Sequence, residues 1–296
     1  MFIEPFIQYL QFEKRYSPHT ITGYRHDLED FMAYCSRVYD MNDPLQLRHT
    51  QIRSWVVSLM EKGLGARSVN RKISTLKSFY RFLMKNGQLD KNPMQKVVAP
   101  KIGKKLPVFL NEESMELTRD RDLYGIGYEG MRDWLIIDLL YSTGMRRSEL
   151  LRLKPSDLDF YNRQLKVLGK GNKERLLPFN GELATQMKEF LTLRQQTFGA
   201  DAADFLLLNS RGKPLQARQL YQIVHQLLSK VSTADRKSPH VLRHTFATHL
   251  LNHGADINAI KELLGHASLA ATQVYTHNTI EKLKDIYQQA HPKAKT

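Results

Sequence analysis

The chain has 296 residues, of which 42% are hydrophobic, and it carries a formal net charge of +14. This length allows two domains of ordinary size, and this composition excludes wholesale disorder. No apolar run reaches about 18 residues, and the first residues do not resemble a signal peptide, so we expect no membrane insertion and a cytoplasmic location. The single cysteine, Cys35, excludes an internal disulfide and a cysteine cluster for zinc, and we expect it to be buried. The positive charge predicts a polyanionic partner, with acidic lipid or acidic protein as the alternatives to nucleic acid.

The N-terminal part of the chain is predicted to form amphipathic helices at 5–16, 18–39, 50–62 and 66–86. Ser17 followed by Pro18 is typical of an N-cap with proline at the first helical position. Gly63 and Gly87 are typical helix stops.

Basic residues are concentrated near the helix at 66–86, because residues 62–105 contain twelve Lys or Arg against one acid, Asp90. Apolar residues recur on this helix at intervals of three and four, at Val69, Ile73, Leu76, Tyr80 and Leu83. Its remaining surface carries the cations Arg67, Arg71, Lys77, Arg81 and Lys85. This pattern predicts a helix that lies along a DNA groove, and the alternative is an ordinary solvated surface helix.

The segment at 98–107 has proline, glycine and lysine but no apolar period, which is typical of an extended basic linker. We expect its cations to contact the DNA backbone as well: Lys101, Lys104 and Lys105.

The C-terminal part is predicted to contain helices at 131–142, 148–153, 182–197, 216–229, 239–252, 257–264 and 269–277. A β-hairpin is predicted at 163–179, where two strand-like runs flank the sequence GKGNK. The stretch at 120–130 is irregular and no element is predicted there.

Separated segments of this part carry residues that suit the cutting and rejoining of a phosphodiester. Phosphoryl transfer needs cations on the non-bridging oxygens, a nucleophile and a proton donor for the leaving oxygen. The candidates are Arg146 in TGMRRSEL, Lys170 in GKGNKER, His240 and Arg243 in SPHVLRH, His266 in LLGH and Tyr275 in TQVYTH.

Four of these candidates, His240, Arg243, Arg146 and Tyr275, also have an ordinary structural explanation. His240 and Arg243 share a helical face, but such a pair often caps or bridges locally. Arg146 lies three residues before Glu149 and a salt bridge alone would explain both. Tyr275 has an ordinary pKa near 10 unless cationic neighbours stabilise its phenolate, so by default it would be a core residue.

Neither a metal nor a nucleotide cofactor is expected. Histidines recur at four-residue spacing on the predicted helix 239–252, but no HExxH motif is present. The GKG turn lacks the spacing of a phosphate-binding loop and precedes a strand.

The motifs TGMRRSELLRL, GKGNKERLLPF, SPHVLRHTFATHLLNHGADI and LLGHASLAATQVYTH together resemble those of the tyrosine recombinases, and within them the bacterial Xer group that resolves chromosome dimers. The resemblance implies a mainly α fold. It implies a SAM-like helical core-DNA-binding domain at 1–97, the linker at 98–107, and a catalytic domain at 108–296 with a small antiparallel sheet and a C-terminal oligomerisation helix.

The resemblance also implies the roles of the candidates. Tyr275 attacks the scissile phosphate and forms a 3′-phosphotyrosyl link, and Lys170 protonates the departing 5′-hydroxyl. The phosphate would be held by Arg146, Arg243 and His266, with His240 assisting proton transfer and Glu149 accompanying the first arginine. Neither ATP nor metal is required.

The partners implied are a double-stranded DNA recombination site, a homo- or hetero-tetramer of recombinases on two duplexes, a paralogous recombinase and a septal DNA translocase. The apolar positions Ile280, Leu283, Ile286 and Tyr287 are at helical spacing and are expected to dock on a neighbouring protomer. The alternative is that they pack on their own domain.

Three other functions remain open from the sequence. An integrase or transposase of a mobile element would use the same chemistry. A type IB topoisomerase would rejoin the same strand as a monomer, and a DNA-binding regulator would have lost catalysis.

Overall fold

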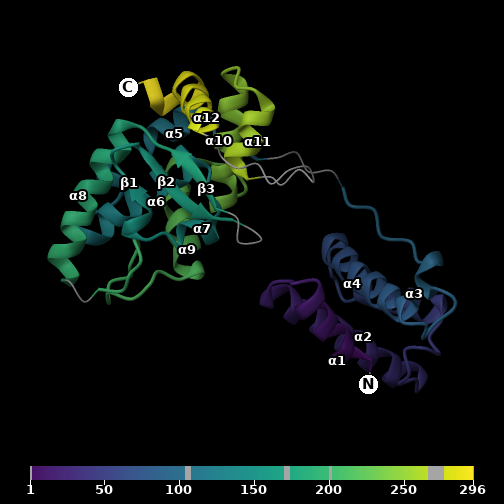
Figure 1. The fold of residues 1–296 in the computed structure, drawn as a ribbon. Helices are drawn as coiled ribbons and strands as arrows, with labels where there is room; N and C mark the ends of the chain where they lie inside the picture. The colour runs from purple at the N-terminus through teal and green to yellow at the C-terminus, as the bar shows by residue number, and fades with distance from the viewer. Residues whose placement is uncertain (1, 104–107, 170–173, 200–201, 266–276, 296) are drawn as a thin grey trace. The chain divides into compact units, whose positions relative to one another are not determined.

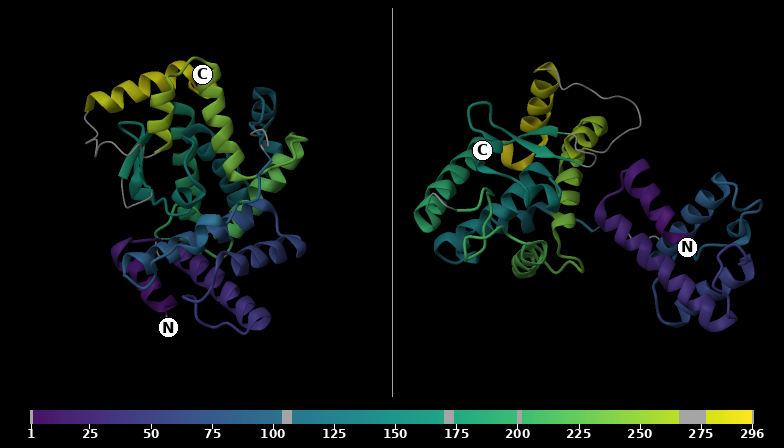
Figure 2. Two further views of the ribbon diagram at one scale, coloured as in Figure 1. Left: turned by 90° about the vertical axis from the view of Figure 1, so that its right-hand side faces the viewer. Right: turned by 60° about the horizontal axis from the view of Figure 1, so that its bottom comes forward.

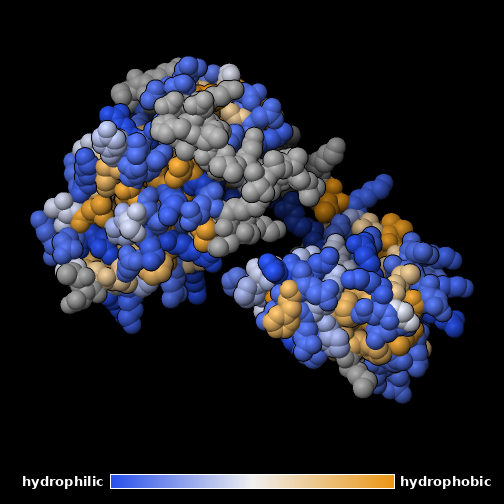
Figure 3. Space-filling model, in the orientation of Figure 1, coloured by the Kyte–Doolittle hydropathy of each residue, from blue (hydrophilic) through white to orange (hydrophobic). Residues whose placement is uncertain are grey.

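The computed structural model describes residues 2–103, 108–169, 174–199, 202–265 and 277–295 (Figure 1). The chain divides into two compact units, Met1–Lys105 and Leu106–Thr296. Both are mainly helical, and the described β-strands belong to one small antiparallel sheet in the second unit, so the predicted fold class is confirmed. No described helix is long and apolar enough to cross a membrane. On the face shown in Figure 3, hydrophilic side chains predominate on both units.

The first unit is a helical bundle. Its α-helices are α1 (Ile3–Gln8), α2 (Pro18–Tyr39), α3 (His49–Glu61) and α4 (Ala66–Lys85). A π-helical turn, η1 (Tyr9–Glu13), continues α1, and a 3-10 turn, η2 (Pro93–Lys96), follows α4. Ser17 accepts a hydrogen bond from the backbone N–H of Thr20 at 3.3 Å, so the predicted N-cap of α2 is present.

The apolar stripe of α4 forms the centre of this unit's core. All five predicted stripe residues are no more than 1% exposed, and they pack with side chains of α2 and α3 such as Phe31 and Trp55. Cys35 is also fully buried, as predicted, and burial raises the pKa of its thiol to about 12. The period of three and four therefore identified the buried side of α4 correctly.

The second unit surrounds a long apolar helix. Its α-helices are α5 (Glu112–Leu117), α6 (Gly127–Thr143), α7 (Arg147–Leu150), α8 (Gly181–Phe198), α9 (Ala217–Val231), α10 (Pro239–Asn252), α11 (Ile257–Leu264) and α12 (His277–Ala290). Its 3-10 turns are η3 (Arg121–Leu123), η4 (Pro155–Asp157) and η5 (Pro292–Lys295). Helix α6 is buried on nearly every side and contacts α8, α9 and α10. Figure 1 labels these helices, and Figure 2 shows the same unit from two further directions.

Helix α6 begins four residues earlier than the predicted helix at 131–142, inside the stretch for which no element was predicted. The reason is that the backbone at Gly125 lies close against the first turn of the helix at Gly130. A Cβ at Gly130 would lie 2.2 Å from the carbonyl oxygen of Gly125, so the loop can fold against the first turn only because residue 130 is glycine.

The sheet has the strand order β1 (Leu158–Asp159), β2 (Gln164–Leu168) and β3 (Glu174–Pro178), all antiparallel. The pairing of Leu165 with Leu177 and of Val167 with Arg175 confirms the hairpin predicted at 163–179. Strand β1 was not predicted, because its two residues are too short for a period of two to appear.

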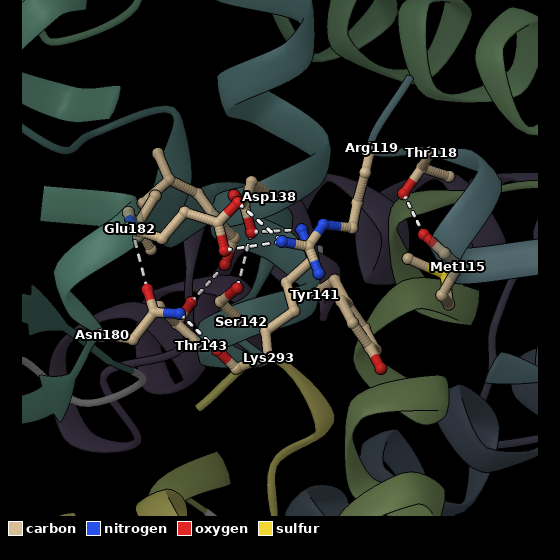
Figure 4. Close-up of polar contacts among 12 residues, drawn as sticks. Met115, Thr118, Arg119, Asp138, Tyr141, Ser142, Thr143, Asn180, Glu182 and Lys293 are labelled. Atoms are coloured by element: carbon tan, nitrogen blue, oxygen red, sulfur yellow. Dashed lines mark hydrogen bonds and ion pairs between the residues drawn. The ribbon is translucent and has the colours of Figure 1, made fainter. Parts of the chain in front are cut away.

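Helix α12 packs within its own unit. Leu283 and Tyr287 belong to the core of this unit, and Ile286 packs partly buried against it. The segment that follows is fastened to α6, because Lys293 Nζ lies 3.0 Å from Asp138 Oδ1 (Figure 4). Within α6, Ser142 Oγ donates to the same oxygen at 2.6 Å. In the single chain the apolar face of α12 thus takes the alternative arrangement that the sequence left open, and docking on a neighbour stays a prediction. The side chain of Ile280 and most of the helix predicted at 269–277 lie outside the described residues.

Candidate active site

The turn between α6 and α7 places Arg146. Helix α6 ends at Gly144, which has a left-handed backbone with φ of 61°. A Cβ on this residue would lie 2.3 Å from the ring of Phe246 in α10, so glycine serves both the turn and the close packing of α6 on α10. The extended residue Arg146 then starts α7, and its side chain leaves the core half-buried.

Glu149 is the centre of a cluster of arginines. Its Oε1 accepts hydrogen bonds from Nη1 of Arg146 at 2.8 Å and Nη1 of Arg175 at 2.7 Å. Its Oε2 accepts from the backbone N–H of Arg146 at 2.6 Å and from Nη2 of Arg175 at 2.9 Å. Burial raises the pKa of Glu149, but the hydrogen bonds and charge of Arg175, with further bonds from Arg146, outweigh burial and keep that pKa below its usual value. The carboxylate therefore stays ionised and holds both guanidinium groups.

Arg243 projects from α10 into the same region. Its Nη1 donates to the carbonyl of Gly144 and its Nη2 to the carbonyl of Leu264, both at 2.6 Å. Burial, followed by the charges of Arg146 and Arg175, lowers the pKa of Arg243 to about 10. The group remains a cation at neutral pH.

The arginines converge on the C-terminal end of α11. Nε of Arg175 donates to the carbonyl of Leu263 at 3.0 Å, and Nη2 of Arg146 donates to the carbonyl of Gly265 at 2.9 Å. With the bond from Arg243 to Leu264, three consecutive carbonyls at this helix end are each bound by a different arginine. Such carbonyls lack partners within the helix and carry its negative dipole end, so cations are stabilised there. The next residue along the chain is His266.

His240 is exposed on the first turn of α10, one turn before Arg243. Burial and the nearby His240 lower the pKa of His244. Among the described residues, no group of His, Cys, Asp or Glu is arranged to hold a metal ion.

The other catalytic candidates lie outside the described residues. These are Lys170, His266 and Tyr275. In the sequence, Lys170 lies between β2 and β3, and the other two lie between α11 and α12.

Arg175 was not among the residues that the sequence motifs indicated. It lies on β3 with a side chain 5% exposed, and it contributes as many hydrogen bonds to the cluster as Arg146 does. A signal was present, because the alternation of the predicted strand places Arg175 on the same face as the buried Leu177. A buried arginine needs a charged partner, and that requirement would have singled it out.

The cluster can bind an anion. Its three guanidinium groups outnumber its one carboxylate, and Arg146 presents a side chain that is 33% exposed. Guanidinium groups match the geometry of phosphate oxygens, and in a partly buried site their attraction is weakly screened. The arrangement suits a phosphodiester whose negative charge increases in the transition state.

Some of the predicted DNA-contact residues of the first unit are exposed cations. Arg67, Lys77 and Arg81 are exposed on α4 and form no ion pair with any described residue, and Lys101 is exposed as well. Lys104 and Lys105 lie outside the described residues.

Two of the predicted DNA-contact cations of α4 already have carboxylate partners. Arg71 forms a two-pronged pair with Asp27, whose side chain is fully buried and also binds Lys72 at 3.1 Å and Thr75 at 2.9 Å. Lys85 lies 4.0 Å from Glu13. Spacing could not distinguish these cations from unpaired ones, because Asp27 belongs to another helix.

Two known protein families match parts of the chain. The one described as "Phage integrase family" matches residues 109–282, and "Phage integrase, N-terminal SAM-like domain" matches residues 3–87.

Curated proteins similar to this chain include "Tyrosine recombinase XerC" of Bacillus subtilis (strain 168), which is 39% identical over 99% of this chain and 97% of that protein. The protein of the same description from Oceanobacillus iheyensis is 41% identical over 99% and 97%. Among solved structures, the XerH site-specific recombinase bound to difH substrate is 24% identical, with a TM-score of 0.69 over 96% of this chain and 84% of that one. The Tn1549 transposon integrase in complex with transposon right end DNA is 21% identical, with a TM-score of 0.71 over 96% and 98%.

Proposed function

Because the chain belongs to the phage integrase family, we propose that its arginine cluster is the phosphate-binding part of a recombinase active site. The protein is a site-specific tyrosine recombinase, which cuts and rejoins DNA strands. The observation that carries the assignment is that Arg146 and Arg243 bind neighbouring carbonyls at the end of α11, directly before the segment that contains His266 and Tyr275.

In the proposed reaction the phenolic oxygen of Tyr275 attacks the phosphorus of the scissile phosphodiester. A bond from phosphorus to the tyrosine oxygen forms, and the bond to the 5′ oxygen breaks. Arg146 and Arg243 stabilise the negative charge of the pentacoordinate phosphorus, and His266 donates a hydrogen bond to a phosphate oxygen.

Proton transfers complete the step. His240 assists removal of the phenolic proton, and Lys170 protonates the departing 5′ oxygen. The 5′-hydroxyl of a partner strand then attacks the phosphotyrosine and restores a phosphodiester, so one bond is exchanged for a similar one and no external energy source is needed. Glu149 does not touch the phosphate, but it orients Arg146, which does.

We further propose that this reaction resolves chromosome dimers at cell division, in the cytoplasm. Support comes from relatives named for the tyrosine recombinase XerC that match nearly the whole chain. The proposed assembly is a homo- or hetero-tetramer of recombinases on two DNA duplexes, with a paralogous recombinase and a septal DNA translocase as further partners. Exposed Arg67, Lys77 and Arg81 are proposed to contact the DNA backbone.

The experiment uses the full chain and a nicked duplex that carries the recombination site, on which a covalent complex accumulates. Tyr275→Phe is expected to abolish the covalent complex and to leave the Kd for DNA unchanged, because only the nucleophilic oxygen is removed. Tyr161→Phe is the matched control, since Tyr161 is 95% exposed in the turn between β1 and β2, at the opposite end of β2 from the Lys170 turn. Covalent complex in Tyr275→Phe at the wild-type level would refute the assignment.

A further inference from the structure

Arg175 is enclosed on every side by protein. Its guanidinium donates two hydrogen bonds to the carboxylate of Glu149, at 2.7 and 2.9 Å, and one to the carbonyl of Leu263 at 3.0 Å. A Cβ at Gly265 would lie 3.2 Å from its side chain, so the backbone at the end of α11 also covers it. With three donors engaged and 5% of the side chain exposed, Arg175 is directed at Glu149 and Leu263, whereas Arg146 has a side chain that is 33% exposed.

The placement of Arg146 depends on the same carboxylate. Each oxygen of Glu149 accepts one hydrogen bond from Arg146 and one from Arg175. Arg175 therefore fixes the plane of the carboxylate, and the carboxylate in turn fixes both the backbone N–H and the guanidinium of Arg146. The further contact of Arg146, with the carbonyl of Gly265, is a single hydrogen bond at 2.9 Å.

Repulsion among the three arginines makes the carboxylate of Glu149 important for the position of Arg146. Arg146, Arg175 and Arg243 carry like charges in one partly buried site, and the pKa of Arg243 is lowered by burial and by the other two. Without a fixed carboxylate between them, the more exposed Arg146 would move toward solvent, because its side chain is 33% exposed while that of Arg175 is 5% exposed.

We infer that Arg175 is a positioning residue of the recombinase, which holds Arg146 in place for the scissile phosphate by acting through Glu149. This inference rests on the proposed function, in which Arg146 binds that phosphate. Two proposed functional residues then belong to this part of the chain, because β3 carries Arg175 and Lys170 precedes β3 in the sequence.

The test compares Arg175→Lys with wild type in single-turnover formation of the covalent complex on the nicked duplex. Lysine keeps the charge but cannot form the two-pronged bond to a carboxylate. The rate is expected to fall on the order of 10- to 100-fold, as for a catalytic group misplaced by about 1 Å, while the Kd for DNA changes less than about threefold.

Arg132→Lys is the matched control. Arg132 is a similarly buried arginine that pairs with Asp133 at 2.7 Å and donates to the carbonyl of Leu208 at 3.2 Å. It lies on α6, about 16 Å along the helix axis before the last residue, Thr143, at about 1.5 Å per residue. Both variants are assayed well below their Tm, so a general loss of stability affects them alike. A rate for Arg175→Lys equal to that of Arg132→Lys would overturn the inference.

A double-mutant cycle with Glu149→Gln identifies the route of action. If Arg175 acts through Glu149, the two changes together slow the reaction much less than the product of their single effects. Effects that multiply would refute that route. Should Arg175→Lys fail to fold, the double variant Glu149→Gln/Arg175→Gln, which leaves no charge of the pair unpartnered, is compared with Glu149→Gln. A rate within about fivefold supports the inference and a larger further loss overturns it.

The variant Arg146→Lys separates this inference from the proposed function. Rapid formation of the covalent complex by Arg146→Lys would refute the role of Arg146 itself. A slow Arg146→Lys together with a fast Arg175→Lys would refute only the role of Arg175.

Discussion

Replacing Glu149 by glutamine should strongly destabilise the second unit. The side chain is 2% exposed, and its carboxylate accepts four hydrogen bonds from two arginines. Glutamine keeps the shape but removes the charge, so the guanidinium of Arg175 stays buried without a counterion. Removing one partner of a buried ion pair typically costs about 3–5 kcal/mol.

The expected fall in Tm follows from the size of the unit, Leu106–Thr296. A domain of about 150–250 residues loses about 2–4 °C per kcal/mol, so we expect a decrease of roughly 6–20 °C near neutral pH. The measurement is thermal unfolding of the full chain followed by circular dichroism. Glu174→Gln is the control, because Glu174 is an exposed neighbour that lies 3.7 Å from Lys166 and should contribute at most about 1 kcal/mol.

The pH dependence tests the cause. The folded pKa of Glu149 is lowered, so its contribution is complete above the unfolded pKa of about 4.3 and is lost as the pH falls through the folded pKa. The Tm difference between wild type and Glu149→Gln should therefore shrink as the pH falls below about 4. A Tm difference of less than about 2 °C at neutral pH, or one that does not change on acidification, would refute the argument that the buried charge stabilises the cluster.

Three further predictions concern other parts of the chain. Gly144→Ala should lower the Tm and slow the covalent reaction, because its Cβ would lie 2.3 Å from Phe246 at a φ of 61°; a variant as stable and active as wild type would contradict this. Changing Arg67 and Arg81 to glutamine should weaken DNA binding and make the slope of log K against log salt less steep by about 0.9 for each phosphate that the variant no longer neutralises, and an unchanged slope in salt titrations would exclude a role for these residues in DNA binding. Asp27→Asn should cost about 1–3 kcal/mol in denaturant unfolding of the first unit, since it removes the buried carboxylate that binds Lys72 and Thr75 and leaves Lys72 with Asp30 at 2.8 Å, and a loss below about 0.5 kcal/mol would contradict this.

Local patterns predicted much of the architecture. The helices at 18–39, 239–252 and 257–264 agree with α2, α10 and α11 to the residue, because each begins at a capping signal and ends near glycine or at a change of period. The hairpin was predictable for the same reason, since alternation and a glycine turn are properties of neighbouring residues. The motif resemblance likewise indicated Arg146, Arg243 and Glu149 without coordinates.

Contacts between distant segments could be decided only by the folded chain. Arg71 has the same helical position and charge as a DNA-binding cation, but the buried Asp27 of α2 holds its guanidinium. Arg175 and Glu149 are 26 residues apart in sequence, so no helical or strand period relates them. The sequence pattern predicts that α12 has an apolar face. Only the folded chain shows that this helix packs on α10 and β3. The physical reason is that periodicity reports which side of an element avoids water, while the choice of partner depends on which other groups the tertiary fold brings within bonding distance.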